Sequence, residues 1–243
     1  MNYLFIAGTP RSGTSAITEL LSAHANIALG MERFKKLYNP NRVTEELFNE
    51  KHFFTYNDEE TNVLLEGAKY DKYYKNLKQK YAYSTVRGDK YPFLFKNYHT
   101  LAERFGDKCQ FIYIVRNPYS VASSWNVRAK KPKDKWPLEN DYSVSVKHWN
   151  DANRRTLNAI KKGYKIQIVE YDKLYTESVN IPYLETIVQT IGIELDDGIL
   201  KEYEVQISEF NRKIKDKPLD LNDEQKQYIA DNIDMSLYHQ LFN

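Results

Sequence analysis

Short apolar runs alternate with helical patterns along most of the chain. The first run covers residues 3–7 and ends at Gly8, after which apolar residues recur at helical spacing. Further apolar runs cover residues 83–87, 110–115 and 165–171; each is bounded by Gly, Asp or Pro and is followed by another helical pattern. This alternation predicts an α/β fold with a central parallel sheet flanked by helices.

Capping residues mark where several of the predicted helices begin and end. Asn117 and Pro118 follow the third apolar run as an N-cap and a first helical residue. Gly163 and Gly192 stand where two later helical patterns stop. Asn222, with a glutamine three residues further on, is typical of the capping box that starts a helix. These signals predict a series of discrete helices between and after the strands.

The segment from about residue 34 to residue 80 has a different pattern. It is helical but irregular, rich in aromatic and charged residues and poor in glycine. We interpret it as a helical insertion near the mouth of a site. The chain has 243 residues, a length that one large α/β domain can hold, so we expect a single domain over residues 1–243 with this insertion.

Composition and charge exclude several classes of protein. No apolar run approaches the roughly 18 residues that a membrane span requires, so we expect no transmembrane segment. Lys and Arg number 35 against 33 Asp and Glu, a formal net charge of +2. With so small an excess, any bound anion must be held by a local cluster of cations, and nucleic-acid binding is disfavoured.

Cysteine usage and the N-terminus bear on compartment and metal content. The single cysteine, Cys109, cannot form an internal disulfide, and no Cys/His cluster indicates a metal site. We therefore expect no metal. The first residues lack a basic region followed by a long apolar region, so we interpret them as a first strand and expect a cytoplasmic protein.

The residues directly after the first strand have the pattern of a phosphate-binding loop. Residues 8–15 read Gly-Thr-Pro-Arg-Ser-Gly-Thr-Ser and lead into a helix, where backbone N–H groups and the positive end of the helix can bind an anion. Thr14 replaces the lysine of the G-x-x-x-x-G-K-[ST] motif, which reaches the outer phosphates of ATP. The loop therefore predicts binding of a phosphate-like group by a poor ATPase; the alternative is a tight strand-to-helix turn.

A second anion-binding pattern follows the third run. Arg116 stands at the carboxyl end of a predicted strand, the edge where ligands collect on parallel sheets. Ser124 lies eight residues later, about two turns into the next helix. The guanidinium group can make a bidentate contact to a phosphate, and the serine hydroxyl can donate to the same group.

Together, these two loops resemble the sulfotransferase family that uses 3′-phosphoadenosine 5′-phosphosulfate (PAPS) as donor. The resemblance covers most of the chain and implies a fold similar to that of P-loop NTPases. Residues 88–92 and 171–174 stand where bacterial members and the Golgi glycan sulfotransferases have related segments. The family resemblance further implies which residues bind the 5′-phosphosulfate of the donor: Arg11, Ser12, Gly13, Thr14 and Ser15.

The resemblance assigns the rest of the donor site as well. Arg116 and Ser124 would bind the 3′-phosphate, and Tyr171 corresponds to a family tyrosine near the adenine. Arg212 and Lys213 fall where a late basic loop closes over the nucleotide. The donor would be PAPS and the product adenosine 3′,5′-bisphosphate (PAP), with no metal.

Transfer of a sulfuryl group to an alcohol needs a base that takes the hydroxyl proton. Asp89 is the first candidate, because it aligns with the catalytic glutamate in the Glu-Lys-x-Pro motif of glycan sulfotransferases; the alternative is that it caps the following helix. Glu32 is the second candidate. Lys90 either steadies the sulfuryl oxygens or is solvated, and Arg11 would neutralise charge on the leaving phosphate oxygen.

The sequence thus predicts a sulfotransferase that moves the sulfuryl group of PAPS to a hydroxyl of a saccharide or small metabolite by in-line displacement. Two alternatives remain: a P-loop nucleotide kinase, against which Thr14 argues, and a non-catalytic nucleotide-binding protein. Trp125 and Trp149 are predicted to be core residues and not substrate platforms.

Overall fold

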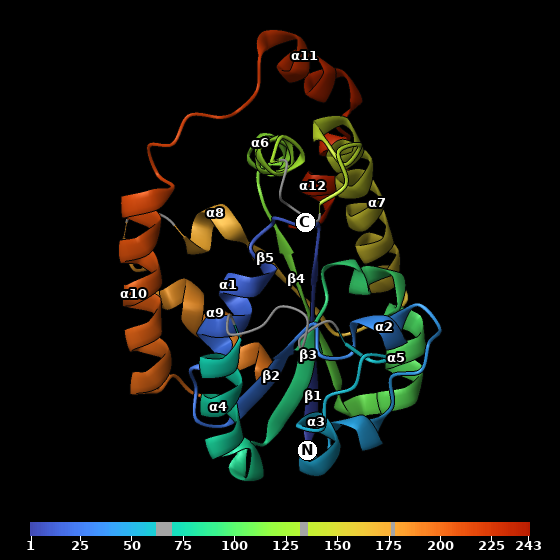
Figure 1. Cartoon of the computed structure of the whole chain (residues 1–243), viewed down its shortest axis with the longest axis vertical. Coiled ribbons are helices and arrows are strands. Elements are labelled where there is room, and N and C mark those ends of the chain that lie inside the picture. The colour runs from blue at the N-terminus through green and yellow to red at the C-terminus, as the bar shows by residue number, and fades with distance from the viewer. Residues whose placement is uncertain (62–69, 132–135, 176–177) are drawn as a thin grey trace.

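The computed structural model describes residues 1–61, 70–131, 136–175 and 178–243 (Figure 1). Its centre is a five-stranded sheet in the order β2-β3-β1-β4-β5. All four strand pairs are parallel, which confirms the predicted α/β fold. The strands are β1 (Asn2–Gly8), β2 (Ile27–Met31), β3 (Val86–Lys90), β4 (Cys109–Val115) and β5 (Ile166–Glu170).

The two faces of the sheet carry different side chains. Phe5 and Phe111 point into a core that is largely aromatic, whereas their neighbours Ile6 and Ile112 point into a largely aliphatic one. This alternation follows from the two-residue period of a strand. Helices α5 (Tyr98–Phe105) and α7 (Tyr142–Lys161) cover the aromatic face, and α1 (Thr14–Ser22), α9 (Ile181–Ile191) and α10 (Asp197–Lys213) cover the aliphatic face (Figure 1).

The remaining elements are short or lie at the periphery of the sheet. The described parts of segment 34–80 contain four helical elements, and residues 62–69 of the predicted insertion lie outside the described residues. Helix α6 (Pro118–Ala129) begins at the predicted Asn117 cap, and α11 (Asp223–Asn232) has the predicted capping box. The others are α2 (Lys35–Tyr38), η1 (Glu45–Phe48), α3 (Glu50–Phe53), α4 (Asp71–Lys80), η3 (Tyr81–Tyr83), η4 (Pro92–Lys96), η5 (Gly106–Lys108), α8 (Tyr171–Leu174) and α12 (Met235–Gln240).

Three elements differ from the sequence-based prediction. The second predicted strand, at 83–87, begins only at Val86, because the residues before it form the 3-10 helix η3. Strand β2 was not predicted, although all five of its residues are buried. Helix α10 was not predicted either, so Arg212 and Lys213 lie in the last turn of a helix and not in a loop.

Because the strands are parallel, their carboxyl ends share one edge of the sheet. The segments that follow β1, β2, β3 and β4 all start there, and α8 begins directly after β5. All the sequence-predicted site residues except Arg212 and Lys213 lie on or near these segments. No helix in the described ranges combines the length and apolarity needed to cross a membrane.

Candidate active site

The loop after β1 needs glycine at both ends. A Cβ on Gly8 would lie 2.6 Å from the carbonyl oxygen of Ile114, and one on Gly13 would lie 2.3 Å from the ring of Tyr171. Gly13 also has a φ of 101°, in the left-handed region that glycine adopts without strain. It is the N-cap of α1 and makes no side-chain cap, so the first N–H groups of this helix are available to an anion.

Two arginines connect the loops after β1 and β4. Arg11 Nε donates to Ser124 Oγ over 2.9 Å, and an Nη of Arg116 donates to the carbonyl oxygen of Arg11 over 3.4 Å. The Arg116 guanidinium carbon lies 4.2 Å from the centre of the Tyr171 ring, a cation–π contact. The structure therefore brings together four of the predicted residues: Arg11, Arg116, Ser124 and Tyr171.

Two tryptophan side chains form hydrogen bonds with the backbone of these loops. Trp125 Nε1 on α6 donates to the carbonyl oxygen of Pro10 over 2.8 Å. Trp149 Nε1 on α7 donates to the carbonyl oxygen of Arg116 over 3.0 Å. Both side chains are buried, which confirms that they are core residues.

Besides Thr9 Oγ1, two buried polar atoms in this region have no hydrogen-bond partner within the described chain: Ser12 Oγ and Arg116 Nε. Buried donors are rarely left unpaired in native proteins, so each requires an explanation. Both belong to residues that the sequence predicted to bind phosphate or phosphosulfate. An anion at this position would supply the missing acceptors, and the residues present therefore fit an anionic donor.

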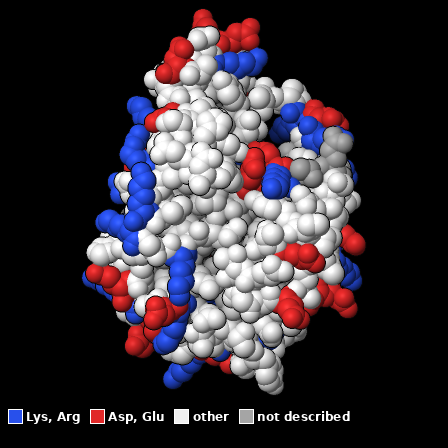
Figure 2. All heavy atoms as spheres, turned by 180° about the vertical axis from the view of Figure 1, so that it is seen from behind, with Lys and Arg blue, Asp and Glu red and all other residues white. Residues whose placement is uncertain are grey.

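A cavity of about 640 Å³ opens beside these loops, between α6 and the end of α10. Figure 2 shows Lys and Arg side chains beside a hollow in the upper part of the back face. Asp172 is the one acidic residue among those that line the cavity in the described chain. The basic residues of its lining are Arg11, Arg116, Arg128, Lys131, Lys213, Lys215 and Lys217.

The sequence analysis missed part of this lining. Ser120, Ser124, Arg128 and Lys131 face the cavity at helical spacing, so extending the pattern from Ser124 along the helix would have found the two cations. An apolar wall was also missed. It consists of Val127, Phe210, Ile214, Pro218 and Leu219.

The predicted nucleotide contacts at Tyr171 and in the late basic segment lie in different surroundings. Tyr171 is 5% exposed and packs between Gly13 and Arg116, where it supports the loop. Lys213 lines the cavity. Arg212 is exposed and lies 3.7 Å from Glu209 in an ion pair on α10.

Asp89 is fully buried in β3, and its carboxylate accepts four hydrogen bonds. Oδ1 accepts from the backbone N–H groups of Arg33 and Lys90 over 3.0 and 2.9 Å. Oδ2 accepts from Phe34 N–H over 2.9 Å and from the Tyr38 hydroxyl over 3.2 Å. Burial raises the pKa of Asp89 to about 6, although these donors act in the opposite direction. Helix η4 has no side-chain cap, so the alternative that Asp89 caps the following helix is wrong.

Glu32 follows β2 and lies between two lysines. Its Oε1 is 3.1 Å from the Nζ of the buried Lys90, and its Oε2 is 3.0 Å from the Nζ of Lys35. Burial alone would raise the pKa of Glu32, but the two positive charges outweigh it and lower that pKa to about 2. The Glu32 side chain is 26% exposed, in contrast to Asp89.

No group of three or more His, Cys, Asp or Glu residues with the geometry to hold a metal ion occurs within the ranges the structure describes.

Comparison with solved structures shows the same fold in several sulfotransferases. The sulfotransferase domain of the Synechococcus PCC 7002 olefin synthase matches with a TM-score of 0.53 and 16% identity, covering 95% of this chain and 94% of that one. The sulfotransferase domain from the curacin biosynthetic pathway gives 0.52 and 15%, covering 95% and 96%. A sulfotransferase from Mycobacterium tuberculosis gives 0.53 and 14%, covering 95% of this chain and 76% of its own.

Structural matches of such low identity show only the fold, whereas a match between sequences can show the family. No curated protein has a matching sequence. A family profile described as the sulfotransferase family matches residues 4–197, which is most of the 243-residue chain. The match includes the loop after β1, Glu32, Asp89, and the arginine and serine after β4. The chain therefore belongs to the sulfotransferase family, a family of PAPS-dependent transferases, as the two anion-binding loops predicted.

Proposed function

We propose that this protein transfers the sulfuryl group of PAPS to a hydroxyl group of an acceptor. The observation that carries the proposal is the basic cavity at the carboxyl edge of the sheet, where the loops after β1 and β4 meet. Its cations match a donor that carries charge at both its 3′- and 5′-positions. The Ser12 hydroxyl and Arg116 Nε, which have no hydrogen-bond partner among the described residues, support the binding of such anionic groups here.

The donor would extend across this cavity in one orientation. Its 5′-phosphosulfate would lie against Arg11, Ser12, Gly13, Thr14 and Ser15 at the start of α1. Its 3′-phosphate would contact Arg116 and Ser124, with Lys213 closing the site from α10. The adenine would lie against the apolar wall at Phe210 and Ile214, residues that line the same cavity.

The chemistry is an in-line displacement at sulfur. The acceptor oxygen forms a bond to sulfur while the bond between sulfur and the bridging oxygen of the 5′-phosphate breaks, and the electron pair of that bond leaves with PAP. Arg11 would stabilise the negative charge that develops on the leaving phosphate. The hydroxyl proton of the acceptor passes to a base on the protein.

Between the two candidate bases, we propose Glu32. The Asp89 side chain has no exposure to an acceptor, because three backbone N–H groups and the Tyr38 hydroxyl enclose its carboxylate. Glu32 is partly exposed and shares the carboxyl edge of the sheet with the donor loop. Lys90 is buried and paired with Glu32, so the alternative that it is solvated is wrong, and it would act by holding the Glu32 carboxylate in place.

The test is transfer of label from sulfur-labelled PAPS to a panel of saccharides and small alcohols. Glu32→Gln should lower kcat by about 10²–10⁴-fold, the range of general-base catalysis, with PAP affinity near that of the unmodified protein. Near-normal kcat in this variant would move the base elsewhere. Magnesium-dependent ATP turnover would instead indicate a P-loop kinase, and donor binding without transfer to any alcohol would indicate a non-catalytic protein.

A saccharide or small metabolite is the acceptor class that we propose, and the panel above decides between them. A single domain over residues 1–243 and a cytoplasmic location remain predictions.

A further inference from the structure

Glu32 has a backbone conformation that needs outside support. Its φ is +57°, in the left-handed region that residues other than Gly, Asn and Asp adopt only at an energetic cost. The peptide groups on both sides of Glu32 form hydrogen bonds. Glu32 N–H donates to the Lys90 carbonyl over 2.8 Å, and Thr61 Oγ1 donates to the Glu32 carbonyl over 3.2 Å. The next two N–H groups, of Arg33 and Phe34, are those that Asp89 accepts.

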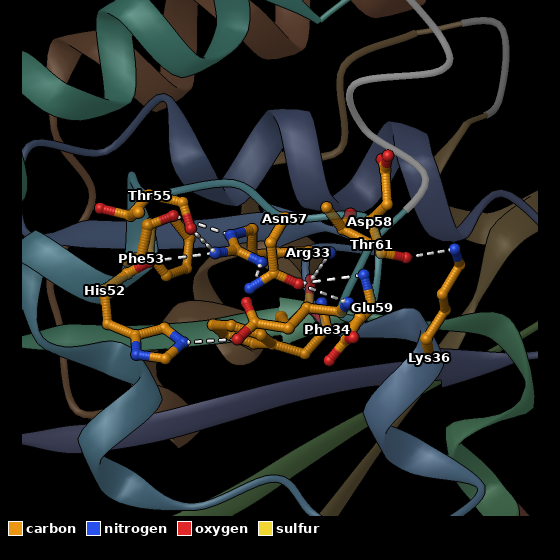
Figure 3. Close-up of polar contacts among 12 residues, drawn as sticks. Arg33, Phe34, Lys36, His52, Phe53, Thr55, Asn57, Asp58, Glu59 and Thr61 are labelled. Carbon is orange, nitrogen blue, oxygen red and sulfur yellow. Dashed lines mark hydrogen bonds and ion pairs between the residues drawn. The ribbon is translucent and has the colours of Figure 1, made fainter.

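The Arg33 side chain extends from this turn into segment 52–61 and is fully buried there (Figure 3). Its Nε donates to the Phe53 carbonyl over 2.8 Å, and one Nη donates to the carbonyls of His52 and Thr55 over 3.0 and 2.9 Å. The other Nη forms an ion pair with Glu60 Oε2 at 2.9 Å. One guanidinium group thus holds four acceptors of a single short segment.

The Glu60 carboxylate completes this cluster from the other side. Its Oε1 lies 2.8 Å from Nε2 of His52, so both carboxylate oxygens have a partner. The backbone of Glu60 is also joined to the segment after Glu32, because Lys36 N–H donates to the Glu60 carbonyl over 3.0 Å. The Arg33–Glu60 pair and this backbone hydrogen bond therefore both connect segment 52–61 to the residues that follow Glu32.

A buried ion pair of this kind is a poor source of stability. The cost of removing both charges from water offsets most of their attraction, and apolar residues of similar size often serve folding as well. The pair instead fixes the relative positions of the groups it joins, because the planar guanidinium group donates its hydrogen bonds in fixed directions. Stability alone thus does not explain an Arg at this position, whereas a requirement for one fixed position of the adjacent Glu32 does.

We propose that Arg33, paired with Glu60, is a positioning residue that fixes the Glu32 carboxylate beside Lys90 for catalysis. The inference rests on the proposed role of Glu32 as the base. Arg33 and Glu60 act through the backbone of the turn and touch neither donor nor acceptor. Breaking their contact allows Glu32 to leave its left-handed conformation and to move away from the reacting hydroxyl.

A double-mutant cycle tests this inference with Glu60→Gln, Glu32→Gln and the pair combined. The probe is hydrolysis of sulfur-labelled PAPS, in which water takes the place of the acceptor, with kcat expressed per PAP-binding site counted by calorimetry. Glu60→Gln should lower kcat by about tenfold or more, since a small misplacement of a catalytic group has effects of that order. KM for PAPS and the Kd of PAP should stay within about twofold, because the donor site is separate.

The cycle separates positioning from a merely structural role. If Arg33 and Glu60 act through Glu32, Glu60→Gln should cause no further loss in the Glu32→Gln background. Equal losses in both backgrounds, or unchanged kcat in Glu60→Gln, would overturn the inference while leaving Glu32 as the base. Unchanged kcat in Glu32→Gln would refute the proposed base itself. Glu59→Gln is the matched control, because Glu59 is the exposed neighbour of Glu60 and should have the kcat of the unmodified protein.

A milder variant covers the case in which Glu60→Gln does not fold. His52→Leu removes the contact to Glu60 Oε1 from a side chain that is 37% exposed, so folding should survive. We expect a loss in kcat of about two- to fivefold that again disappears in the Glu32→Gln background. A loss that persists there, or no loss at all, would count against the inference.

Discussion

The two halves of the carboxyl edge of the sheet handle charge in opposite ways. Around the loops after β1 and β4, the described residues that line an open cavity include seven basic residues and one acidic residue. In these loops, Ser12 and Arg116 each have a buried polar atom without a hydrogen-bond partner among the described residues. Around β2 and β3, Asp89 and Glu32 each have partners at both carboxylate oxygens. The first half is completed only by a ligand, whereas the second is complete before anything binds. Donor binding and catalytic geometry should therefore respond to different mutations.

The largest expected effect lies on the donor side. Arg116→Ala should weaken PAP binding by about 2–5 kcal/mol, as expected when a buried phosphate loses a charged partner. AMP, which lacks the 3′-phosphate, should bind the unmodified protein more weakly than PAP and should lose less from this substitution. Calorimetry with both nucleotides measures each quantity.

A control variant distinguishes a local loss from general damage. Arg155→Ala removes an exposed arginine of α7 that pairs with Asp151 and does not line the cavity, so PAP affinity should not change. Equal affinity for PAP and AMP in the unmodified protein would contradict the assignment of the 3′-phosphate site. A lower Tm of Arg116→Ala without ligand would show that this arginine serves the fold.

The next largest effect concerns Asp89, near β2 and β3, and is a dependence of the free energy of unfolding on pH. Because burial raises the pKa of Asp89 from near 4 to about 6, the folded state binds more protons than the unfolded state between these values. The contribution of Asp89 to the free energy of unfolding should therefore fall as pH rises from 4 to 6, by up to about 3 kcal/mol.

Asp89→Asn isolates this contribution because asparagine does not titrate. The difference in unfolding free energy between the unmodified protein and the variant should shrink over this pH range, measured by urea denaturation at each pH. Glu32, whose pKa is lowered to about 2, has the opposite dependence but is present in both proteins and cancels. A difference that does not change with pH would mean that Asp89 has an ordinary pKa in the folded state.

A smaller effect is expected at the rim of the cavity. Lys217 is exposed, so Lys217→Ala should weaken PAP binding by about two- to fivefold, in line with the small energies of solvent-exposed ion pairs. The difference should diminish as salt is added, since salt screens exposed charges. An effect as large as that of Arg116→Ala would show that Lys217 contacts a phosphate directly.

The smallest expected effect is that of a chelator. In the proposed site, arginine side chains and backbone N–H groups stabilise the negative charge of the donor. EDTA should therefore leave the transfer rate from labelled PAPS unchanged. Loss of activity on chelation, restored by magnesium, would instead favour phosphoryl transfer.

The sequence predicted the donor side of the site better than the other side. The loop at residues 8–15 and the pair Arg116 and Ser124 are local patterns, each readable from neighbours in the chain. The surroundings of Asp89 depend on donors more than 50 residues earlier, in the segment after β2, and no local pattern reports such a contact. A carboxylate that serves as a buried acceptor therefore looked the same in sequence as one available to a substrate.

The elements that were missed had weaker local signals. Strand β2 is short and contains Gly30, and its register is set by pairing with β3. In α10, Ile199, Tyr203 and Ile207 are buried at a spacing of four residues, a pattern that was visible but diluted by charged neighbours. The apolar face of this helix was thus detectable, whereas the strand needed knowledge of its partner.

The tryptophan contacts described above should make the intrinsic fluorescence of the protein sensitive to binding at the donor site. The indole N–H groups of Trp125 and Trp149 bond to the backbone of Pro10 and Arg116, so each chromophore is hydrogen-bonded to a loop that contacts the proposed donor. A nucleotide that shifts either loop alters the polarity around an indole ring and hence its emission spectrum. Donor binding could then be followed in real time by intrinsic fluorescence, with no dye, label or acceptor.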